Sequence, residues 1–136
     1  MRMVGRIQNS AVLERWKGID PDVILTEERI AHIRAGHAAD YDAYNVYIPD
    51  AIENPDCVLE DIKNEDTAMF VKRVDHSGIN VIVRLAYRNN GQGKTSSILT
   101  MYCIGEKRLR RLLRQNPVLY NSVEICYNSI AEGRSK

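Results

Sequence analysis

Ile79-Asn-Val-Ile-Val-Arg-Leu-Ala-Tyr-Arg88 is the most regular stretch of this 136-residue chain. Every odd-numbered position from 79 to 87 is apolar, whereas the even-numbered positions include both arginines. Because successive side chains of a strand point to opposite faces, this period predicts a β-strand with one buried face. Similar runs predict three more strands at 57–62, 67–74 and 95–104. Polar turns separate the runs, one of them at 89–93, and favour an antiparallel meander.

Helical signals flank the predicted strands. Thr26 is a suitable N-cap, and the two glutamates after it suit a first helical turn. Gly36 then favours a helix end, so the pattern predicts a helix over 26–36 and a loop over 38–48. Further helices are expected at 12–16, 50–54, 106–114 and 117–131. The expected fold class is α+β, with N-terminal helices packed on a four-stranded antiparallel β-sheet and with C-terminal helices.

Length and composition favour a single globular domain. The chain has 136 residues, of which 44% are hydrophobic, as in ordinary folded domains. We expect one domain over 1–136, with an N-terminal segment at 1–22 and a C-terminal helical extension at 105–136. No apolar run approaches the about 18 residues of a membrane span, and the N-terminus has no signal-peptide core. A domain excised from a larger delivered protein would have the same features.

The cysteine pattern indicates a reducing environment. Cys57, Cys103 and Cys126 are odd in number and form no CxxC pair. This pattern predicts free thiols, with Cys103 and Cys126 buried in apolar runs, and argues against a disulfide framework or a metal site. We therefore expect a cytoplasmic site of action.

Charge is distributed unevenly, although the net charge is only +1. Residues 20–66 hold 13 acidic and 3 basic side chains, whereas residues 94–136 hold 8 basic and 3 acidic ones. A basic cluster alternates with leucines on the helix expected at 106–114; it consists of Lys107, Arg108, Arg110, Arg111 and Arg114. We expect these five side chains to bind an RNA backbone. A solvated helix face and ordinary charge balance are the competing interpretations.

Two histidines, one on the helix expected at 26–36 and one just past its end, suggest acid–base chemistry. Cleavage of RNA without a metal requires a base for the ribose 2′-hydroxyl, an acid for the leaving oxygen, and donors or cations for the phosphate. Histidine suits the first two roles because its ordinary pKa is about 6.5. His37 follows Gly36 at the predicted helix end and is the main candidate. His32 is a further candidate, with a packed helix residue as the alternative interpretation.

The predicted strands supply cations and hydroxyls for the phosphate. Lys72 and Arg84 interrupt apolar runs, where a charge is costly unless it is paired or functional. Thr100 and Tyr102 share one strand face, and their hydroxyls suit a phosphate. A half-solvated sheet face is the competing interpretation for the cations, and ordinary β-propensity for the hydroxyl residues. No metal-ligand cluster appears in the sequence, so we expect no metal and no cofactor.

The order of these features resembles a known family. The segment Ile24-Leu-Thr-Glu-Glu-Arg-Ile-Ala-His-Ile-Arg-Ala-Gly-His37 is followed by matching segments at 52–58, 72, 79–85 and 98–102. Together they resemble phage- and toxin-associated nucleases of the barnase/EndoU/colicin/RelE-like superfamily, over about residues 24–104. The resemblance implies two helices on a four-stranded antiparallel sheet, with a metal-independent ribonuclease site between them. It also implies a toxin domain of a phage protein or a contact-dependent inhibition system, acting on RNA such as tRNA and restrained by a cognate immunity protein.

The resemblance also implies roles for individual residues. His37 matches the family's histidine after the first helix, and Lys72 matches its strand lysine. The polar residues of the late strand correspond to Thr100 and Tyr102, and Arg84 is a looser match. His32 occupies a helix position of the family where the side chain can be structural. The tail from 106 to 136 is longer than the family's pattern and is a candidate surface for substrate or immunity protein.

We therefore predict a metal-independent endoribonuclease. A non-catalytic RNA- or protein-binding module of the same fold in a phage protein is the main alternative. A transferase that uses His37 and Tyr102 is a second, although the chain lacks a Gly-rich nucleotide loop with the required spacing. A chromosomal RelE-like toxin acting on ribosome-bound mRNA is a third, and the near-neutral charge argues against it.

Overall fold

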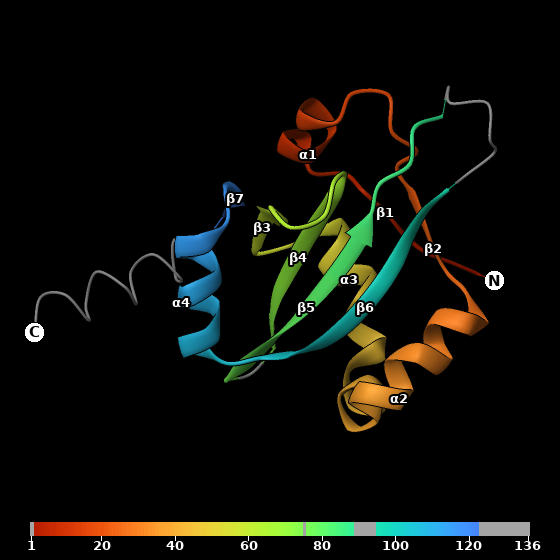
Figure 1. The fold of residues 1–136 in the computed structure, drawn as a ribbon, viewed down its shortest axis with the longest axis vertical. Helices are drawn as coiled ribbons and strands as arrows, with labels where there is room; N and C mark the ends of the chain where they lie inside the picture. Colours follow the sequence, from red (N-terminus) through yellow and green to blue (C-terminus); the bar gives the residue numbers. More distant parts are fainter. Residues whose placement is uncertain (1, 75, 89–94, 123–136) are drawn as a thin grey trace, which may run out of the picture.

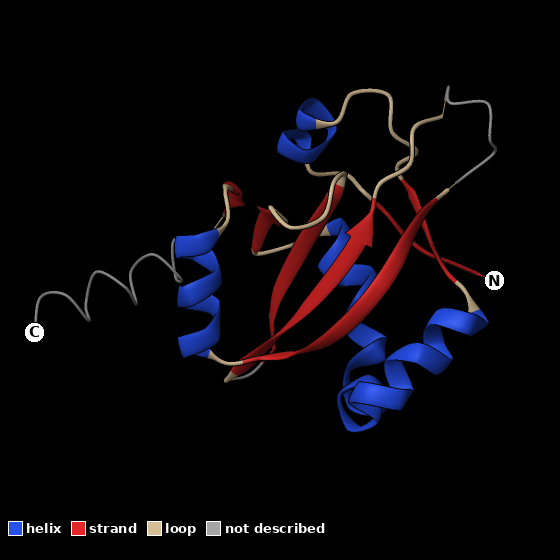
Figure 2. Cartoon of the chain, viewed as in Figure 1, coloured by secondary structure: helices blue, strands red, loops and turns tan. Residues whose placement is uncertain are grey.

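Seven strands form one mixed sheet within residues 2–74, 76–88 and 95–122, the part of the chain that the computed structural model describes (Figures 1 and 2). Their order across the sheet is β1-β2-β6-β5-β4-β3-β7. The strands are β1 Arg2–Arg6, β2 Asp22–Leu25, β3 Cys57–Glu60, β4 Thr67–Val74, β5 Ser77–Arg84, β6 Ser96–Ile104 and β7 Val118–Asn121. The helices are α1 Ser10–Arg15, α2 Glu27–Tyr44, α3 Ile48–Glu53 and α4 Glu106–Gln115, with a 3-10 helix η1 at Asn45–Tyr47.

The sheet differs from the one expected. β3, β4, β5 and β6 lie near the four predicted ranges and pair antiparallel in chain order. However, β2 joins β6 in parallel, β1 adds to β2, and β7 adds to β3. The predicted fold class, N-terminal helices on a four-stranded antiparallel sheet followed by C-terminal helices, is therefore wrong. The three added strands are only four or five residues long, too short to reveal a period in the sequence.

The C-terminal prediction needs the same correction. Residues 118–121 form β7 rather than part of the helix expected at 117–131. Val58 of β3 lies opposite Tyr120, so pairing with an existing sheet edge overrides the local pattern. The rest of that predicted helix, Cys126 and the turn expected at 89–93 lie outside the described residues. The helix expected at 106–114 is confirmed as α4.

Alternation along the central strands creates a buried face, here called the core face. Phe70, Val81 and Met101 occupy neighbouring positions on β4, β5 and β6, and all three are fully buried. They pack in one cluster with Trp16, which follows α1, and Ile33 of α2. Each such side chain contributes about 1.5–3 kcal/mol through removal of apolar surface from water. α3 lies behind β4 and β5 in Figure 1 and covers this face.

The opposite side of the sheet, here called the α4 face, has a smaller apolar cluster. Leu109 of α4 packs there with Val71, Ile104 and Cys57, and all four side chains are buried. Leu112 and Leu113 are only partly buried against this cluster. α4 therefore covers one end of its face, toward β3, while α2 lies toward the β6 side (Figure 1). Within the described residues, no helix is both long and apolar enough to cross a membrane.

Helix α2 runs further than its sequence predicted and bends at His37. The backbone of His37 is non-helical, with φ −141° and ψ 45°, so the predicted stop after Gly36 is a kink rather than an end. The loop expected at 38–48 is wrong, because helix α2 resumes and ends at Tyr44. Tyr41 is buried in the core, and Asn45 caps the end by donating its backbone and side-chain N–H groups to the Tyr41 carbonyl.

The second half of α2 is fastened to the free edge of β6. Asp40 Oδ2 accepts a hydrogen bond of 3.0 Å from the backbone N–H of Cys103. The neighbouring strand β2 pairs with β6 only at Ser96 and Ser97, so this later part of the edge needs another partner. Burial, followed by the Asp40 carboxylate, raises the pKa of the Cys103 thiol to about 11. The thiol therefore stays protonated near neutral pH and is a poor nucleophile.

We expect Asp40→Ala to loosen α2 from β6. The Cys103 N–H would lose its acceptor, which should lower the free energy of unfolding by about 1–3 kcal/mol. Urea unfolding and hydrogen exchange of the Cys103 amide would measure this change. Asp42→Ala is the matched control, since Asp42 lies on the same helix and forms only an exposed ion pair with Arg34. Unchanged amide protection in Asp40→Ala would contradict the assigned contact.

The raised pKa of Cys103 predicts slow alkylation of the folded protein. A higher pKa means less thiolate at any given pH, so at pH 9 iodoacetamide should react with Cys103 roughly fifty-fold more slowly than in the urea-unfolded chain. Mass spectrometry of the Cys103 peptide would follow the reaction. Asp40→Asn should speed it only partly, because burial is the larger cause of the shift. Equal rates in the folded and unfolded chains would show that the thiol is not shielded.

Candidate active site

Tyr102 is the centre of a polar cluster on the α4 face. Its ring centroid lies 5.5 Å from that of His37, at an interplanar angle of 31°. The guanidinium carbon of Arg108 lies 4.5 Å from the centroid of the same ring. The three side chains come from β6, α2 and α4, so the fold joins segments far apart in the sequence. A histidine, a phenol and an arginine thus meet on one surface.

The buried side chain of Asn80 binds the hydroxyl of Tyr102. Asn80 lies opposite Tyr102 in the register of β5 and β6 and is 0% exposed. Its Nδ2 donates a hydrogen bond of 3.2 Å to Tyr102 Oη. Because the phenol oxygen is the acceptor in this bond, its own hydrogen is left for another partner. Tyr102 can therefore donate a hydrogen bond to a ligand while its oxygen is held by Asn80.

His37 reaches this surface because of the kink in α2. Asp40, one turn later, binds the edge of β6, and this brings the helix alongside Tyr102. The side chain of His37 is exposed and in ring contact with Tyr102. His32 is also exposed and lies on the same helix, but it makes no ring contact, hydrogen bond or ion pair with described residues. The structure therefore brings His37, and not His32, to the cluster.

Thr100 is the other predicted hydroxyl near this cluster. It lies opposite Ile82, one alternation before Tyr102 on β6, and it is half-buried. Side chains two residues apart on a strand share a face. The structure therefore places Thr100 and Tyr102 side by side on the α4 face, as the sequence predicted.

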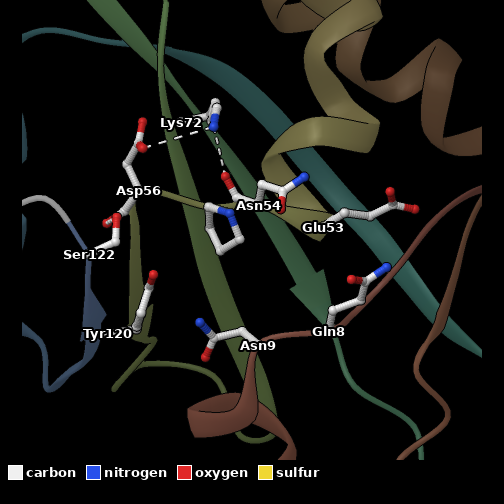
Figure 3. A pocket seen from close by; sticks show the side chains of 9 residues that line it. Gln8, Asn9, Glu53, Asn54, Asp56, Lys72, Tyr120 and Ser122 are labelled. Carbon is white, nitrogen blue, oxygen red and sulfur yellow. Dashed lines mark hydrogen bonds and ion pairs between the residues drawn. The ribbon is translucent and has the colours of Figure 1, made fainter.

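Lys72 lies elsewhere, on the core face. It pairs with Ile79, which pairs with Cys103, so its position alternates with that of the cluster. Its Nζ donates a hydrogen bond of 2.8 Å to the Asn54 carbonyl and lies 3.3 Å from Asp50 Oδ2 and 3.9 Å from Asp56 Oδ1. Figure 3 shows Lys72 directed at Asp56 and Asn54, in a polar pocket of about 430 Å³. The structure does not bring Lys72 to His37.

Arg73, the neighbour of Lys72 on β4, lies on the α4 face instead. Its Nη2 lies 3.8 Å from Glu106 Oε2 at the start of α4. Its Nη1 is buried and has no hydrogen-bond partner among the described residues. The sequence showed that Lys72 and Arg73 must point to opposite faces, but their order gave no reason to prefer either cation.

Arg84 is on the α4 face but far along it. It lies opposite Ser97, four positions from Asn80 on β5, which corresponds to about 13 Å at ~3.3 Å per residue. There it lines a separate pocket of about 590 Å³ that also contains Glu65 and Asp66. Arg84 is exposed and does not join the cluster around Tyr102.

The basic residues of α4 flank the cluster. Lys107, Arg108, Arg111 and Arg114 are exposed, and Arg110 is half-buried. Leu109 faces the sheet, which turns the exposed cations outward. Only Arg108 contacts a described member of the cluster, through the ring of Tyr102. The others lie along the same helix without contacting the cluster in the described residues.

A groove of about 520 Å³ begins at Tyr102 and Arg108. Its floor is apolar, with Met69 of β4 and Ile82 of β5, and Leu112 of α4 forms one wall. Its other wall is the turn between β3 and β4, and Gln115 lies at the end of α4. The cluster therefore opens into a cavity large enough for part of a ligand. Within the ranges described, no three His, Cys, Asp or Glu side chains gather in a way that could hold a metal ion.

Sequence reasoning missed Asn80 and Arg73. Asn80 was detectable as the single amide within the apolar run from Ile79 to Val83, where a buried polar group requires a partner. The partner itself, Tyr102, follows only from the register of two strands. Arg108 was predicted as an RNA-binding residue, but its ring contact depends on where α4 sits.

The chain was compared with known protein families, curated proteins and solved structures. Comparison with curated proteins and with solved structures finds no match. A match to a protein family covers residues 3–111, most of the 136 residues, and the family is described as phage-Barnase-EndoU-ColicinE5/D-RelE like nuclease3. This agrees with the resemblance found in the sequence and supports a nuclease at a coarse level. The chain belongs to the phage-Barnase-EndoU-ColicinE5/D-RelE like nuclease3 family.

Proposed function

We propose that this protein is a metal-independent endoribonuclease that cleaves at the cluster of His37, Tyr102 and Arg108. The observation that carries the proposal is the contact of one aromatic ring with a histidine and with an arginine. These three residue types supply a proton acceptor for the ribose hydroxyl, and a hydrogen-bond donor and a fixed positive charge for the phosphate. Thr100 lies beside Tyr102 and adds a second hydroxyl. Membership of a nuclease family supports the reaction class.

In the proposed reaction, His37 takes the proton of the ribose 2′-hydroxyl. The 2′-oxygen then forms a bond to phosphorus, and the bond from phosphorus to the 5′-oxygen breaks. The hydroxyl hydrogen of Tyr102, free because Asn80 donates to its oxygen, binds a phosphate oxygen. Arg108 compensates the charge that builds up on the phosphate. The leaving 5′-oxygen takes a proton from water, and protonated His37 returns its proton to the solvent, so the products are a 2′,3′-cyclic phosphate and a 5′-hydroxyl.

The biological setting remains as predicted from the sequence. We propose a toxin domain of bacterial or phage origin, acting in a cytoplasm and held in check by an immunity protein. tRNA is the first substrate to test, because several members of the superfamily cleave it. Lys72 and Arg84 are not part of the proposed site, since Lys72 lies on the core face and Arg84 about 13 Å along β5. The alternative, a binding module without catalysis, predicts RNA binding through α4 and no cleavage.

Replacing His37 should abolish cleavage. Purified protein would be incubated in EDTA with total RNA and with tRNA, and the products resolved on a denaturing gel. We expect His37→Ala to lower kcat by about 10²–10⁴-fold, as for loss of a general base. His76→Ala is the matched control, because His76 is an exposed turn residue. His32→Ala separates the two histidines of α2 and should retain activity. Full activity in folded His37→Ala would exclude this site, and no cleavage by any variant would favour the binding module.

Replacing Tyr102 by phenylalanine should separate the hydroxyl from the ring. Tyr102→Phe preserves the ring that contacts His37 and Arg108 but removes the donor to the phosphate. We expect kcat to fall about 10²-fold with little change in KM, as for loss of one transition-state donor. Tyr120→Phe is the control, since Tyr120 lines the pocket of Lys72. An equal fall in kcat/KM caused only by a higher KM would assign the hydroxyl to substrate binding.

A further inference from the structure

The groove beside Tyr102 carries features that cleavage chemistry does not use. It measures about 520 Å³, within the range of about 300–1,000 Å³ typical of ligand sites. Met69 and Ile82 form its floor, and neither takes part in the proposed proton transfers. Tyr102 and Arg108 line both the groove and the cluster. A group bound in the groove would therefore lie next to a phosphate bound at the cluster.

One exposed apolar side chain, that of Ile62, lies on the otherwise polar rim of the groove. Ile62 is 61% exposed, although it sits in a turn where polar side chains are the rule. Its backbone N–H donates a hydrogen bond of 3.3 Å to Asn116 Oδ1. Asn116 in turn donates from Nδ2 to the Leu112 carbonyl at 3.1 Å. Ile62, Met69 and Ile82 line the same groove, and their side chains form a slot suited to a flat, apolar-faced group.

The turn that carries Ile62 is itself ordered. Asp61 Oδ1 accepts from the backbone N–H of Lys63 at 2.9 Å, and its Oδ2 accepts from Asn64 Nδ2 at 3.1 Å. These bonds use the side chains of Asp61 and Asn116 internally. Gln115, by contrast, is exposed, and its side-chain amide has no hydrogen-bond partner among the described residues. The slot thus combines the apolar side chains of Ile62, Met69 and Ile82 with one available amide at its edge.

We infer that this groove is a nucleobase subsite, which binds one unpaired base of the RNA next to the phosphate held by the cluster. This inference rests on the proposed function. A base has apolar faces that suit Met69, Ile82 and Ile62, and polar edges that suit the Gln115 amide. The exposed cations of α4 complement the phosphates that accompany the base. A base paired in a duplex could not enter the slot, so the occupant is single-stranded.

The test uses short oligonucleotides with a single ribose among deoxyriboses, so that only one linkage can be cleaved. Three versions are compared, with both flanking bases present, with the 5′ base removed, and with the 3′ base removed. Removing the base that occupies the groove should lower kcat/KM of the wild-type protein about 10-fold, because stacking on the protein is lost. The same oligonucleotide annealed to its complement should be cleaved more slowly by at least that factor.

Ile62→Ser is the decisive variant, because an exposed side chain can be replaced without loss of the fold. We expect Ile62→Ser to lower kcat/KM on the intact oligonucleotide about 5–10-fold, and to show no further loss when the base is removed. Gln115→Ala should change the order of preference among the four bases. Val46→Ser is the matched control, since Val46 is 71% exposed and lies outside the groove. If base removal costs the same in wild type, Ile62→Ser and Val46→Ser, the groove is not a base subsite.

Measuring oligonucleotide affinity as well as cleavage distinguishes failure of the base subsite from failure of the proposed function. If the wild-type protein cleaves no oligonucleotide, the endoribonuclease proposal fails. Fluorescence anisotropy with the intact and base-lacking oligonucleotides then decides the groove. A tenfold loss of affinity on base removal in wild type but not in Ile62→Ser would keep the subsite as a nucleic-acid-binding feature. Equal affinities for all oligonucleotides would overturn it, whether or not the protein cleaves RNA.

Discussion

The hydrogen bond between the Cys103 amide and the Asp40 carboxylate links the fold to the candidate site. β6 is an inner strand where β2 pairs with it and an edge strand beyond Ser97. An uncovered edge presents backbone donors and acceptors that invite other chains. α2 covers this edge, and its carboxylate satisfies a backbone N–H there. The same contact sets the height of α2 along β6, and thereby brings His37 to the ring of Tyr102.

The kink at His37 follows from the demands on the two halves of α2. Ile33 in the first half and Tyr41 in the second are both buried in the core, while Asp40 must reach the strand edge. A straight helix would keep one side along a single direction and could not meet both demands. This helix instead bends near the edge of the sheet (Figure 1). The break lies at His37, next to Gly36, where the backbone leaves the helical region. The residue with the proposed chemical role is therefore also the point where the helix changes direction.

The division of the sheet into two faces explains what could be read from the sequence. The alternation within 79–88 depends only on local spacing, so the central strands were predictable. The N-cap of α2 at Thr26 was predictable for the same reason. The parallel pairing of β2 with β6 was not, because it joins segments more than seventy residues apart through two short stretches. β7 was also not predictable, because its four residues form a strand through pairing with the neighbouring β3 rather than through a pattern of their own.

The candidate site was predictable to the extent that it depends on residue type and alternation. Tyr102 and Thr100 had to share a face, and a histidine near the end of the first long helix was a reasonable partner. The preference for Lys72 over Arg73 rested on the resemblance alone, because alternation separates the two cations without saying which face is solvated. In the structure, Lys72 is compensated by Asp50 and Asp56 on the core face. Its position therefore favours a structural role. Through these contacts, the half-buried Lys72 holds the loop after α3 against β4.

The same separation reconciles the near-neutral net charge of the chain with the proposed RNA substrate. The net charge of +1 averages over faces that carry opposite charge. Around Lys72, the carboxylates of Asp50, Asp56 and Glu53 gather on the core side of the sheet. On the other side, α4 exposes four cations beside the cluster. What a polyanion meets depends on the local field of the face it approaches, and charges more than about 10 Å away are largely screened at ordinary ionic strength. Net charge is therefore a poor guide to substrate here, and the arrangement of α4 over the sheet is the better one.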